Sequence, residues 1–361
     1  MAWVTESIVM APLALSAIFA AIPALVVHLR AKNFPASVLI IGITILNVQN
    51  FMNAIIWHSV DRFSWWDGKI LCDIEVKLYI GIFQAIDGSI TSIFRQVCTI
   101  LHPDHLVMAP SPRQRKITLV IELILCIFLP LYTMIGHYLT QRTRYWVRIS
   151  AGCVATYDNN RVAPFLTYLW PFVVSIIGSI YCLVSFVRLR KHRKQMASVL
   201  SQIPGPRNSR FYRLFALACT LLAIYCPAST LIFVRNVRVP LHVYSWSYIH
   251  PPDWSQRIIE DIGSSVGELH ITPDRWAQVL TAYLCFAFFG LGQEATQMYK
   301  DWITHTKRVL GLQPRSNQDN SGQPSLELVR FGAHQGGRLP EHRPDSHIRD
   351  LHLSTISELD S

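Results

Sequence analysis

Charged residues are scarce in this chain, since only 16% of its 361 residues are Asp, Glu, Lys or Arg. A typical soluble domain contains about 25% of such residues. Hydrophobic residues make up 51% of the sequence, and a soluble protein of this length would still need a well-charged surface. The shortage of charge therefore excludes an ordinary soluble domain and indicates an integral membrane protein.

Several motifs of catalysis and cofactor binding are also missing. The chain contains neither the HExxH helix of zinc proteases nor the GxxxxGK[ST] loop of P-loop NTPases. Its histidines are scattered without the spacing of metal ligands. The last apolar run holds no lysine that could form a Schiff base with retinal. We therefore expect no enzyme, no catalytic residues, no cofactor and no metal site.

What the sequence does contain is a series of seven long apolar runs. A helix needs about 20 mostly apolar residues to cross the hydrocarbon core of a bilayer. After the seventh run the composition turns polar and is typical of a disordered segment. The pattern predicts an all-α membrane protein, a seven-transmembrane helix bundle, with a membrane domain over 1–300 and a tail over 301–361. The expected spans are 7–29, 36–58, 71–97, 117–139, 163–187, 212–235 and 276–299.

Basic residues between the runs set the expected orientation. With the N-terminus outside, Lys and Arg are about twice as dense in the inner loops as in the outer loops, and basic loops favour the cytoplasm. The C-terminal tail is then cytoplasmic. The net charge of +10 belongs to these loops, so we expect contact with the bilayer and not with nucleic acid. The densest cluster suits both membrane anchoring and docking of an acidic cytosolic partner; it includes Arg188, Arg190, Lys191, Arg193, Arg210 and Arg213.

The third run is the most polar and is expected at the centre of the bundle. Gln84, Asp87, Thr91 and Arg95 recur at steps of three and four residues, so they share one helix face. Polar groups inside a membrane are costly and are often functional. The pattern leaves open whether Asp87 contacts a ligand or bonds a neighbouring helix.

Asparagines and a proline mark two further runs. Asn47, Asn50 and Asn53 share a face of the second run, where interhelical hydrogen bonds are favoured over ligand contact. Pro227 lies within the sixth run and frees a backbone carbonyl there. It predicts either a static kink or a hinge.

Two of the eight cysteines fall on the outer side in this orientation. Cys72 begins the third span and Cys153 lies in the second outer loop. Because the outside is oxidising, we expect a disulfide between them if their Cα atoms approach closely enough. The third outer loop is rich in Trp and Tyr, including Trp246 and Trp254. These residues predict an interfacial aromatic belt or, alternatively, a lid over a lipid-like ligand.

Several stretches in order are similar to one family. The second run and its loop read LNVQNFMNAIIWHSVDRFSWWDGKILCDI, an Asn-rich helix that leads to Trp and then Cys-Asp-Ile. The fifth run reads WPFVVSIIGSIYCLVSFVRLRKHRKQM, and the seventh contains FAFFGLGQEATQMYKDW. Over roughly residues 7–300 these stretches resemble the fungal mating-pheromone receptors of the a-factor type, which are class D G-protein-coupled receptors. The composition suggests a basidiomycete member.

The resemblance implies a multi-pass plasma-membrane receptor that binds a farnesylated peptide pheromone and activates a heterotrimeric G protein. The ligand is expected in an outer cavity between spans three, five, six and seven. The expected G-protein contacts are Arg95 and the basic cluster defined above, and Pro227 is the expected hinge. The expected ligand contacts are Tyr79, Gln84, Asp87, Tyr168 and Tyr283.

Two other functions stay open from the sequence. A receptor of this family could respond to a ligand that has no role in mating. A small-solute transporter would need a polar path, which the Asn face of the second run and Asp87 could partly supply. The chain shows no internal repeat of the kind that many transporters have. A second copy of the chain is a further candidate partner.

Overall fold

The structure is a computed structural model that describes residues 5–59, 61, 65–101, 111–191, 206–261 and 273–309. Packing divides the chain into two units, Met1–Leu310 and Gly311–Ser361. The second unit lies outside the described residues, and so does most of the tail expected over 301–361. The boundary between membrane domain and tail therefore stays a prediction.

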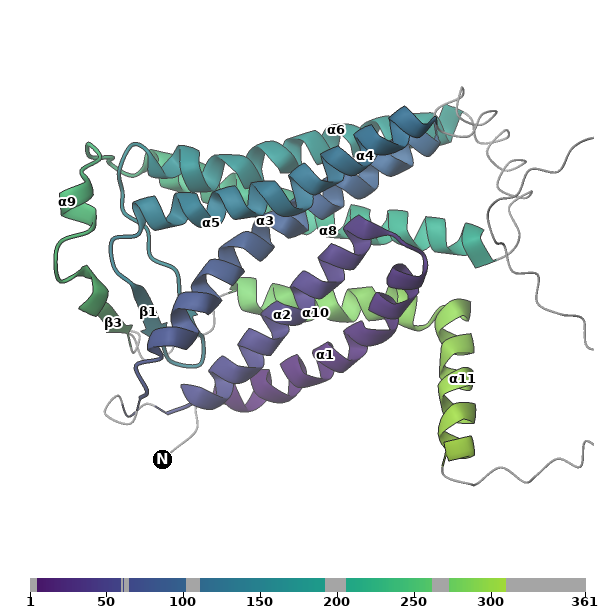
Figure 1. Cartoon of the computed structure of the whole chain (residues 1–361), viewed down its shortest axis with the longest axis horizontal. Coiled ribbons are helices and arrows are strands. Elements are labelled where there is room, and N and C mark those ends of the chain that lie inside the picture. Colours follow the sequence, from purple (N-terminus) through teal and green to yellow (C-terminus); the bar gives the residue numbers. More distant parts are fainter. Residues whose placement is uncertain are drawn as a thin grey trace, which may run out of the picture. The chain divides into compact units, whose positions relative to one another are not determined.

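Helices dominate the first unit, and Figure 1 shows most of them running lengthwise through one bundle. Three of them contain or adjoin a short π-helical segment, a feature that is frequent at functional sites. The helical elements are α1 (Thr5–Arg30), α2 (Phe34–Ile56), α3 (Lys69–Ile100), α4 (Pro112–Leu123), η3 (Ile124–Phe128), α5 (Leu129–Thr140), η4 (Pro164–Tyr168), α6 (Leu169–Lys191), α8 (Pro206–Arg238), α9 (Trp246–Ile249), η5 (Trp254–Gln256), α10 (Pro273–Cys285), η6 (Phe286–Gly290) and α11 (Gln293–Val309).

Five helices among the described residues are long and apolar enough to cross a membrane. They coincide with the first, second, fourth, fifth and sixth expected spans. The other two expected spans correspond to α3 and to α10 with η6, which do not reach the same apolarity. The coarser prediction of a helical membrane bundle is confirmed; the count of seven stays a prediction. The five helices are Thr5–Arg30, Phe34–Ile56, Pro112–Thr140, Pro164–Lys191 and Tyr212–Arg238.

The seventh expected span is shorter than the sequence pattern suggests. Its helix ends at Gly290, and α11 begins at Gln293 after a turn. A Cβ atom on Gly292 would lie 1.9 Å from Nη1 of Arg213, so this turn packs directly against α8. The hydroxyl of Tyr299 in α11 donates to the carbonyl of Gly290 at 3.0 Å. The apolar run 276–299 therefore spans two helices.

Helix α3 lies in the middle of the packing, with contacts to α2, α5, α6 and α8. Its buried Ile86, Ile90 and Phe94 belong to the main hydrophobic cluster. Its Thr91 hydroxyl donates to the Val174 carbonyl of α6 at 2.9 Å. Polar side chains of α3 are thus shielded from lipid by the surrounding helices, which explains how the least apolar span can occupy the centre.

The asparagine face of α2 joins helices together. Asn50 Nδ2 donates to Oε1 of Gln278 in α10 at 2.9 Å, and Asn47 Nδ2 donates to the Gln278 carbonyl at 3.2 Å. Asn53 Nδ2 donates to the Ala151 carbonyl in the outer loop at 3.2 Å. These amides are buried and bond between elements, which is the first of the two roles that the sequence pattern left open.

A small sheet closes one end of the bundle (Figure 1). Strand β1 (Tyr145–Arg148) pairs antiparallel with β2 (Gly152–Val154), with Val147 opposite Cys153. Strand β3 (Ile258–Asp261) pairs parallel with the other edge of β1, with Tyr145 opposite Ile258. Gly152 has a φ of 66° and a Cβ atom there would lie 2.3 Å from Asn53, so only glycine fits the tight turn above α2.

Candidate functional site

A pocket of about 270 Å³ lies between the helices at the end that carries the sheet. It draws its walls from α3, α5, η4, α6, α8 and α10, together with one residue of the outer loop. Two of its residues, Thr167 and Tyr168, belong to the π-helical segment η4. The lining residues are Tyr79, Ile80, Phe83, Gln84, Thr133, Tyr157, Thr167, Tyr168, Pro171, Ser229, Ile232 and Asp274.

Aromatic rings form most of the pocket wall. The rings of Tyr157 and Tyr168 lie 5.1 Å apart between their centroids. Tyr79 stacks on Phe83 at 6.1 Å, and Phe83 contacts Tyr225 at 5.5 Å. Such walls suit an apolar ligand group, because aromatic side chains offer large rigid contact areas.

A charged cluster lies at one edge of the pocket. The Tyr79 hydroxyl donates to Oδ2 of Asp274 at 2.6 Å. The neighbouring Arg275 is only 4% exposed, and its guanidinium lies 4.8 Å from the centre of the Tyr79 ring. Arg275 also donates to the Cys153 carbonyl at 3.0 Å and to Oδ1 of Asn50 at 3.2 Å. This cluster links the pocket to the outer loop and to α2.

Two polar residues of α3 lie deeper in the bundle. Gln84 lines the pocket and is 1% exposed. Neither its amide nitrogen nor its carbonyl oxygen has a hydrogen-bond partner among the described residues. Asp87, three residues further along α3, is also buried, and its Oδ2 has no partner in the same part of the chain. A buried amide without partners is costly, so Gln84 is available for a polar ligand group.

The structure places the five expected ligand contacts in three environments. Tyr79, Gln84 and Tyr168 line the pocket, whereas Asp87 is not part of its wall. The Tyr283 hydroxyl instead bonds Ser16 at 2.7 Å and donates to the Leu13 carbonyl at 3.2 Å. Tyr283 therefore faces α1, away from the pocket.

Sequence reasoning missed nine of the twelve lining residues, among them Phe83, Tyr157 and Asp274. Phe83 reads as one more apolar residue of its span, and Tyr157 lies in a loop without periodicity. Asp274 could have been found from the sequence, because it lies next to Arg275 directly before the last apolar run. A charged pair at the mouth of a span is a candidate for function.

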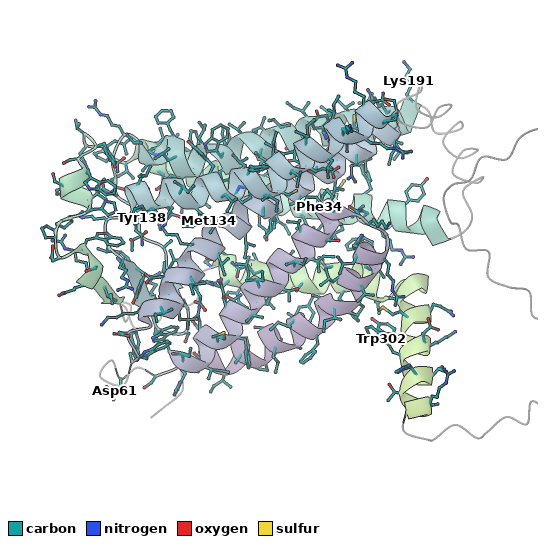
Figure 2. All side chains as sticks on the ribbon, in the orientation of Figure 1. Phe34, Asp61, Met134, Tyr138, Lys191 and Trp302 are labelled. Atoms are coloured by element: carbon teal, nitrogen blue, oxygen red, sulfur yellow. A yellow bond between two sulfur atoms is a disulfide. The ribbon has the colours of Figure 1, made fainter. Side chains whose placement is uncertain are left out.

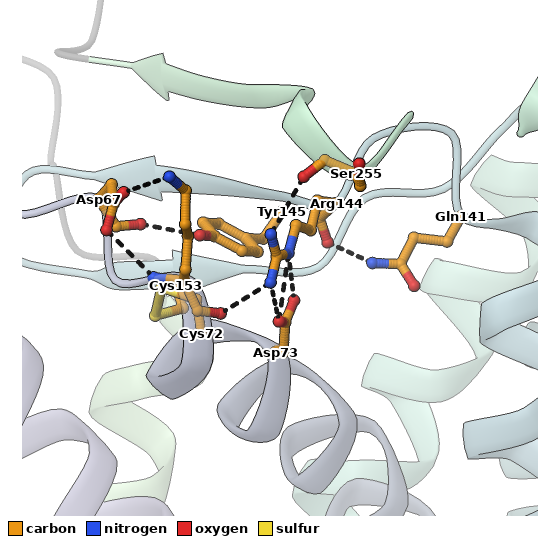
Figure 3. Close-up of polar contacts among 9 residues, drawn as sticks. Asp67, Cys72, Asp73, Gln141, Arg144, Tyr145, Cys153 and Ser255 are labelled. Atoms are coloured by element: carbon orange, nitrogen blue, oxygen red, sulfur yellow. Dashed lines mark hydrogen bonds and ion pairs between the residues drawn. A yellow bond between two sulfur atoms is a disulfide. The ribbon is translucent and has the colours of Figure 1, made fainter. Parts of the chain in front are cut away.

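The two singled-out cysteines are joined in the structure (Figure 3). Cys72 and Cys153 form a disulfide with a Cα–Cα distance of 5.2 Å, which ties β2 to the first turns of α3. Gly68 precedes α3 with a φ of 64°, and a Cβ atom there would lie 2.8 Å from Sγ of Cys72.

An ion pair reinforces the same junction (Figure 3). Arg144 bonds the Asp73 carboxylate through Nε at 2.8 Å and also through Nη2, and the bond to Asp73 raises the pKa of the Arg144 guanidinium. Burial raises the pKa of the adjacent Tyr145 to about 12. The Tyr145 hydroxyl therefore stays protonated and donates to the Asp67 carbonyl at 2.8 Å. These bonds hold the β1–β2 loop and the start of α3 together beside the pocket.

The aromatic loop between α8 and α10 packs on the end of α5 that lies near the sheet. Trp254 donates through Nε1 to the Gln141 carbonyl at 3.0 Å and meets the Tyr138 ring edge-on at 5.9 Å. Trp246 stacks on His250 at 4.0 Å and is 47% exposed. Neither tryptophan lines the pocket. This arrangement fits the interfacial belt; the lid stays an alternative for Trp246.

The opposite end of the bundle carries the basic cluster. Lys191 at the end of α6 and Tyr138 in α5 mark these two ends in Figure 2. Arg188 donates through Nη1 to the Cys98 carbonyl at the end of α3 at 2.6 Å. Arg213 of α8 donates to the Phe288 carbonyl of η6 at 3.5 Å. Each arginine therefore joins two helices.

The remaining basic residues differ in exposure and in partner. Arg190 and Lys191 are exposed. Arg95 lies in α3 and donates through Nη2 to the Thr118 carbonyl of α4 at 3.2 Å. Pro227 lies inside α8, which continues as a helix on both sides. Arg193 and the side chain of Arg210 lie outside the described residues.

Potential metal sites are not found in the part of the chain that the structure describes. No group of three His, Cys, Asp or Glu side chains there could hold a metal ion. The molecule is thus a helical membrane bundle with an aromatic pocket and a disulfide-tied loop at one end and a basic surface at the other. This is the architecture of a membrane receptor.

The particular family follows from comparison with known proteins. The profile of the pheromone A receptor family matches residues 9–309, so the chain belongs to that family. The pheromone a factor receptor of Saccharomyces cerevisiae is 29% identical over 82% of the chain and 61% of its own length. Pheromone receptor 1 of Ustilago hordei is 27% identical over 92% of the chain and 93% of its length.

Coverage differs among the relatives. The pheromone B alpha 3 receptor of Schizophyllum commune is 24% identical over 80% of this chain and 46% of its own length. The chain thus spans between about half and two thirds of that receptor and of the yeast receptor. The names of these relatives are those of receptors and not of enzymes.

Proposed function

We propose that the protein is a G-protein-coupled mating-pheromone receptor of the plasma membrane that binds a farnesylated peptide. Seven helices span the bilayer in this proposal, with the N-terminus outside and the C-terminus in the cytoplasm. The observation that carries it is the aromatic pocket bordered by Asp274, found in a member of the pheromone A receptor family. Several relatives are named for a pheromone.

The pocket's size and chemistry assign different contacts to the lipid part and to the peptide part of the ligand. Its volume of about 270 Å³ is near the lower limit of about 300 Å³ for small-molecule pockets, so it accommodates only part of a lipopeptide. The aromatic wall of Phe83, Tyr157 and Tyr168 suits the farnesyl chain. Asp274 and the unpartnered Gln84 amide suit backbone or amino groups of the adjoining peptide. The rest of the peptide lies outside the pocket in this account.

Transmission starts at the charged cluster. A ligand group that bonds Asp274 competes with the Tyr79 hydroxyl and alters the surroundings of Arg275, which bonds α2 and the Cys153 carbonyl. A ligand shifts a conformational equilibrium only through its different affinity for the two states. The cluster supplies such a difference because its bonds join α10 to three other elements, α3, α2 and β2.

The basic end is the proposed G-protein surface. Arg188 links α6 to α3, and Arg213 links α8 to η6. Movement of α8 about Pro227 breaks the Arg213 link, opens the inner ends of α6 and α8, and offers Arg213 to an acidic partner. Arg190 and Lys191 are already exposed and supply the first encounter, since exposed charges steer association.

The transporter alternative has less support from the bundle interior. A polar path would use the Asn face of α2, but Asn47, Asn50 and Asn53 are committed to bonds with α10 and with the outer loop. Solute uptake into proteoliposomes that contain the purified protein would restore that alternative.

A reporter assay in yeast tests the proposed function. The chain is expressed in a strain that lacks its own pheromone receptors and carries a pheromone-responsive reporter, and a panel of farnesylated fungal peptides is applied. We expect one peptide to activate the reporter and the same peptide without its farnesyl group to be inactive. Equal responses to both forms would contradict the lipid assignment. Silence towards the whole panel from a receptor shown at the cell surface would favour the non-mating ligand.

A further inference from the structure

A second cavity lies between α3 and α4. Its volume is about 500 Å³. Its walls come from the last turns of α3 and the first turns of α4, near the basic end of the molecule. The lining residues are Arg95, Gln96, Thr99, Ile100, Gln114, Arg115, Ile117, Thr118, Leu119 and Glu122. We call this cavity the α3–α4 cleft.

The cleft exists because the two helical stretches pack closely as far as Gly88 and then diverge. At Gly88 of α3 a Cβ atom would lie 2.1 Å from the carbonyl oxygen of Leu125 in η3. Helices that cross at an angle separate on moving away from the contact. Two side-chain bonds bridge the widening gap, from Arg95 to the Thr118 carbonyl at 3.2 Å and from Gln96 to Glu122 at 2.7 Å.

Two arginines give the cleft its positive charge. The Nε atom of Arg95 is buried and has no hydrogen-bond partner among the described residues, while its Nη2 bonds Thr118. Arg115 lies on the opposite wall and is exposed. The one acid of the cleft, Glu122, is 5% exposed and accepts a hydrogen bond from Gln96. Glu122 therefore repels an anion from the depth of the cleft and favours its placement between the two arginines.

The rest of the cleft wall is apolar and open. Ile100, Ile117 and Leu119 are between 48% and 54% exposed. Helix α4 begins one of the stretches that are apolar enough to cross a membrane, and Arg113, Arg115 and Lys116 lie in its first turns. The cleft thus combines a cationic mouth at the expected membrane boundary with an apolar wall that continues along a membrane helix. A soluble acidic peptide would not need that wall, whereas a phospholipid would use both parts.

We propose that the α3–α4 cleft binds an anionic phospholipid, with the phosphate between Arg95 and Arg115 and an acyl chain along Ile100, Ile117 and Leu119. Guanidinium groups match phosphate geometry with paired hydrogen bonds. Anionic lipids are enriched in the cytoplasmic leaflet, on which the basic end of the bundle is expected to lie. This site is independent of the pheromone pocket and does not rest on the proposed ligand. It bears on signalling, because a bound lipid would hold the inner ends of α3 and α4 together.

A lipid titration of the purified full-length receptor tests the proposal. Native mass spectrometry measures the bound fraction of phosphatidylserine, with phosphatidylcholine as the neutral lipid of equal chain length. The test variants are Arg95→Gln, Arg115→Gln and the double variant. The matched control is Arg113→Gln, which removes one positive charge from the same turn of α4 but does not line the cleft.

We expect the wild type and Arg113→Gln to bind phosphatidylserine in preference to phosphatidylcholine. Each single test variant should lose about fivefold in phosphatidylserine affinity, the effect of one basic residue near a charged membrane, and the double variant about 25-fold. Equal losses for Arg113→Gln and Arg115→Gln would overturn the site in favour of general charge attraction. Unchanged lipid binding with lost G-protein activation in Arg95→Gln and Arg115→Gln would assign the cleft to the G protein. Where the double variant fails to fold, the exposed Arg115→Gln decides alone.

A second arm separates the lipid from a free phosphate. Glycerophosphoserine, which has the same headgroup and no acyl chains, is added to the receptor in phosphatidylcholine. We expect it to bind far more weakly than phosphatidylserine because it cannot use the apolar wall. Equal affinity would overturn the lipid proposal and leave a binding site for the headgroup alone.

Discussion

At the scale of single residues, the hydroxyl of Tyr79 carries the link between pocket and charged cluster. It donates to Asp274 at 2.6 Å. Tyr79→Phe removes this bond while it keeps the ring and its stacking on Phe83. A hydrogen bond to a charged group contributes about 1.5–3 kcal/mol. Because the ligand then no longer competes with the Tyr79 hydroxyl for Asp274, we expect the concentration of pheromone that gives half-maximal reporter activity to fall at least tenfold.

The matched control for Tyr79 is a tyrosine on the other side of the bundle. Tyr283→Phe makes the same chemical change, but its hydroxyl bonds Ser16 and the Leu13 carbonyl in α1. We expect pheromone potency to stay unchanged in this variant. A larger change in potency for Tyr283→Phe than for Tyr79→Phe would show that the ligand lies elsewhere.

The disulfide gives a second prediction at this scale. Cys72→Ser or Cys153→Ser releases β2 from α3, and loss of a native disulfide costs about 2–5 kcal/mol of unfolding free energy. We expect a lower thermal midpoint for the receptor solubilised in detergent with either substitution. The double variant should be no less stable than the single variants. Either substitution already removes the disulfide, so the two losses of unfolding free energy do not add. Additive losses would mean that the cysteines act separately.

Individual residues were predictable from the sequence only where chemistry limited the choice. Cys72 and Cys153 stood out because they alone fell on the outer side, and the structure joins them. Tyr168 and Tyr283 looked equivalent, since both are tyrosines within apolar runs. Helix rotation decides which one faces the pocket, and rotation depends on packing against neighbours that the sequence does not specify.

At the scale of elements, the crossing of α3 and η3 depends on glycine. A Cβ atom on Gly88 would lie 2.1 Å from the backbone oxygen of Leu125, so Gly88→Ala forces the helices apart. Overpacking of this kind costs about 1–3 kcal/mol. We expect a lower thermal midpoint for Gly88→Ala in detergent. The control is Gly81→Ala, whose Cβ atom would meet only the flexible side chain of Met134. A smaller loss for Gly88→Ala than for Gly81→Ala would contradict the rigid crossing.

The exposed basic end of α6 gives a further prediction. Reversal of charge in Arg190→Glu with Lys191→Glu removes the proposed docking charges without breaking the bonds of Arg188 or Arg213. We expect reporter activation to fall at least tenfold while surface expression and pheromone binding persist. The control, Arg235→Glu, reverses an exposed charge at the other end of α8. Full activation in the double variant would refute the docking role.

Element boundaries followed the apolar pattern well except at the seventh run. Five runs coincide with helices apolar enough to cross a membrane. The prediction of one span over 276–299 fails because Leu291 and Gly292 form a turn that packs on Arg213. Apolar composition alone cannot reveal such a turn, since leucine and glycine are both common in membrane helices.

At the scale of the whole molecule, ligand binding is proposed for one end of the helix bundle and G-protein docking for the other. The pocket lies at the end of the bundle that carries the disulfide and the Arg144–Asp73 ion pair. The basic surface lies at the other end of α6. The class of membrane protein was evident from the shortage of charge, and the family from the order of its motifs. The pocket was not evident from the sequence, because it forms from single residues of helices that are far apart in the chain.

The central claim is that the outer pocket receives the farnesylated pheromone and activates the G protein through the bundle. The most direct test measures nucleotide exchange on the G-protein α subunit by the receptor reconstituted in nanodiscs, with the active peptide from the reporter panel. Ile232→Trp fills the pocket that Ile232 lines. Ile176→Trp makes the same change on α6 at an equal exposure of 40%, outside the pocket lining. We predict that peptide-stimulated exchange is lost with Ile232→Trp and kept with Ile176→Trp, whereas full stimulation in both variants would contradict the account.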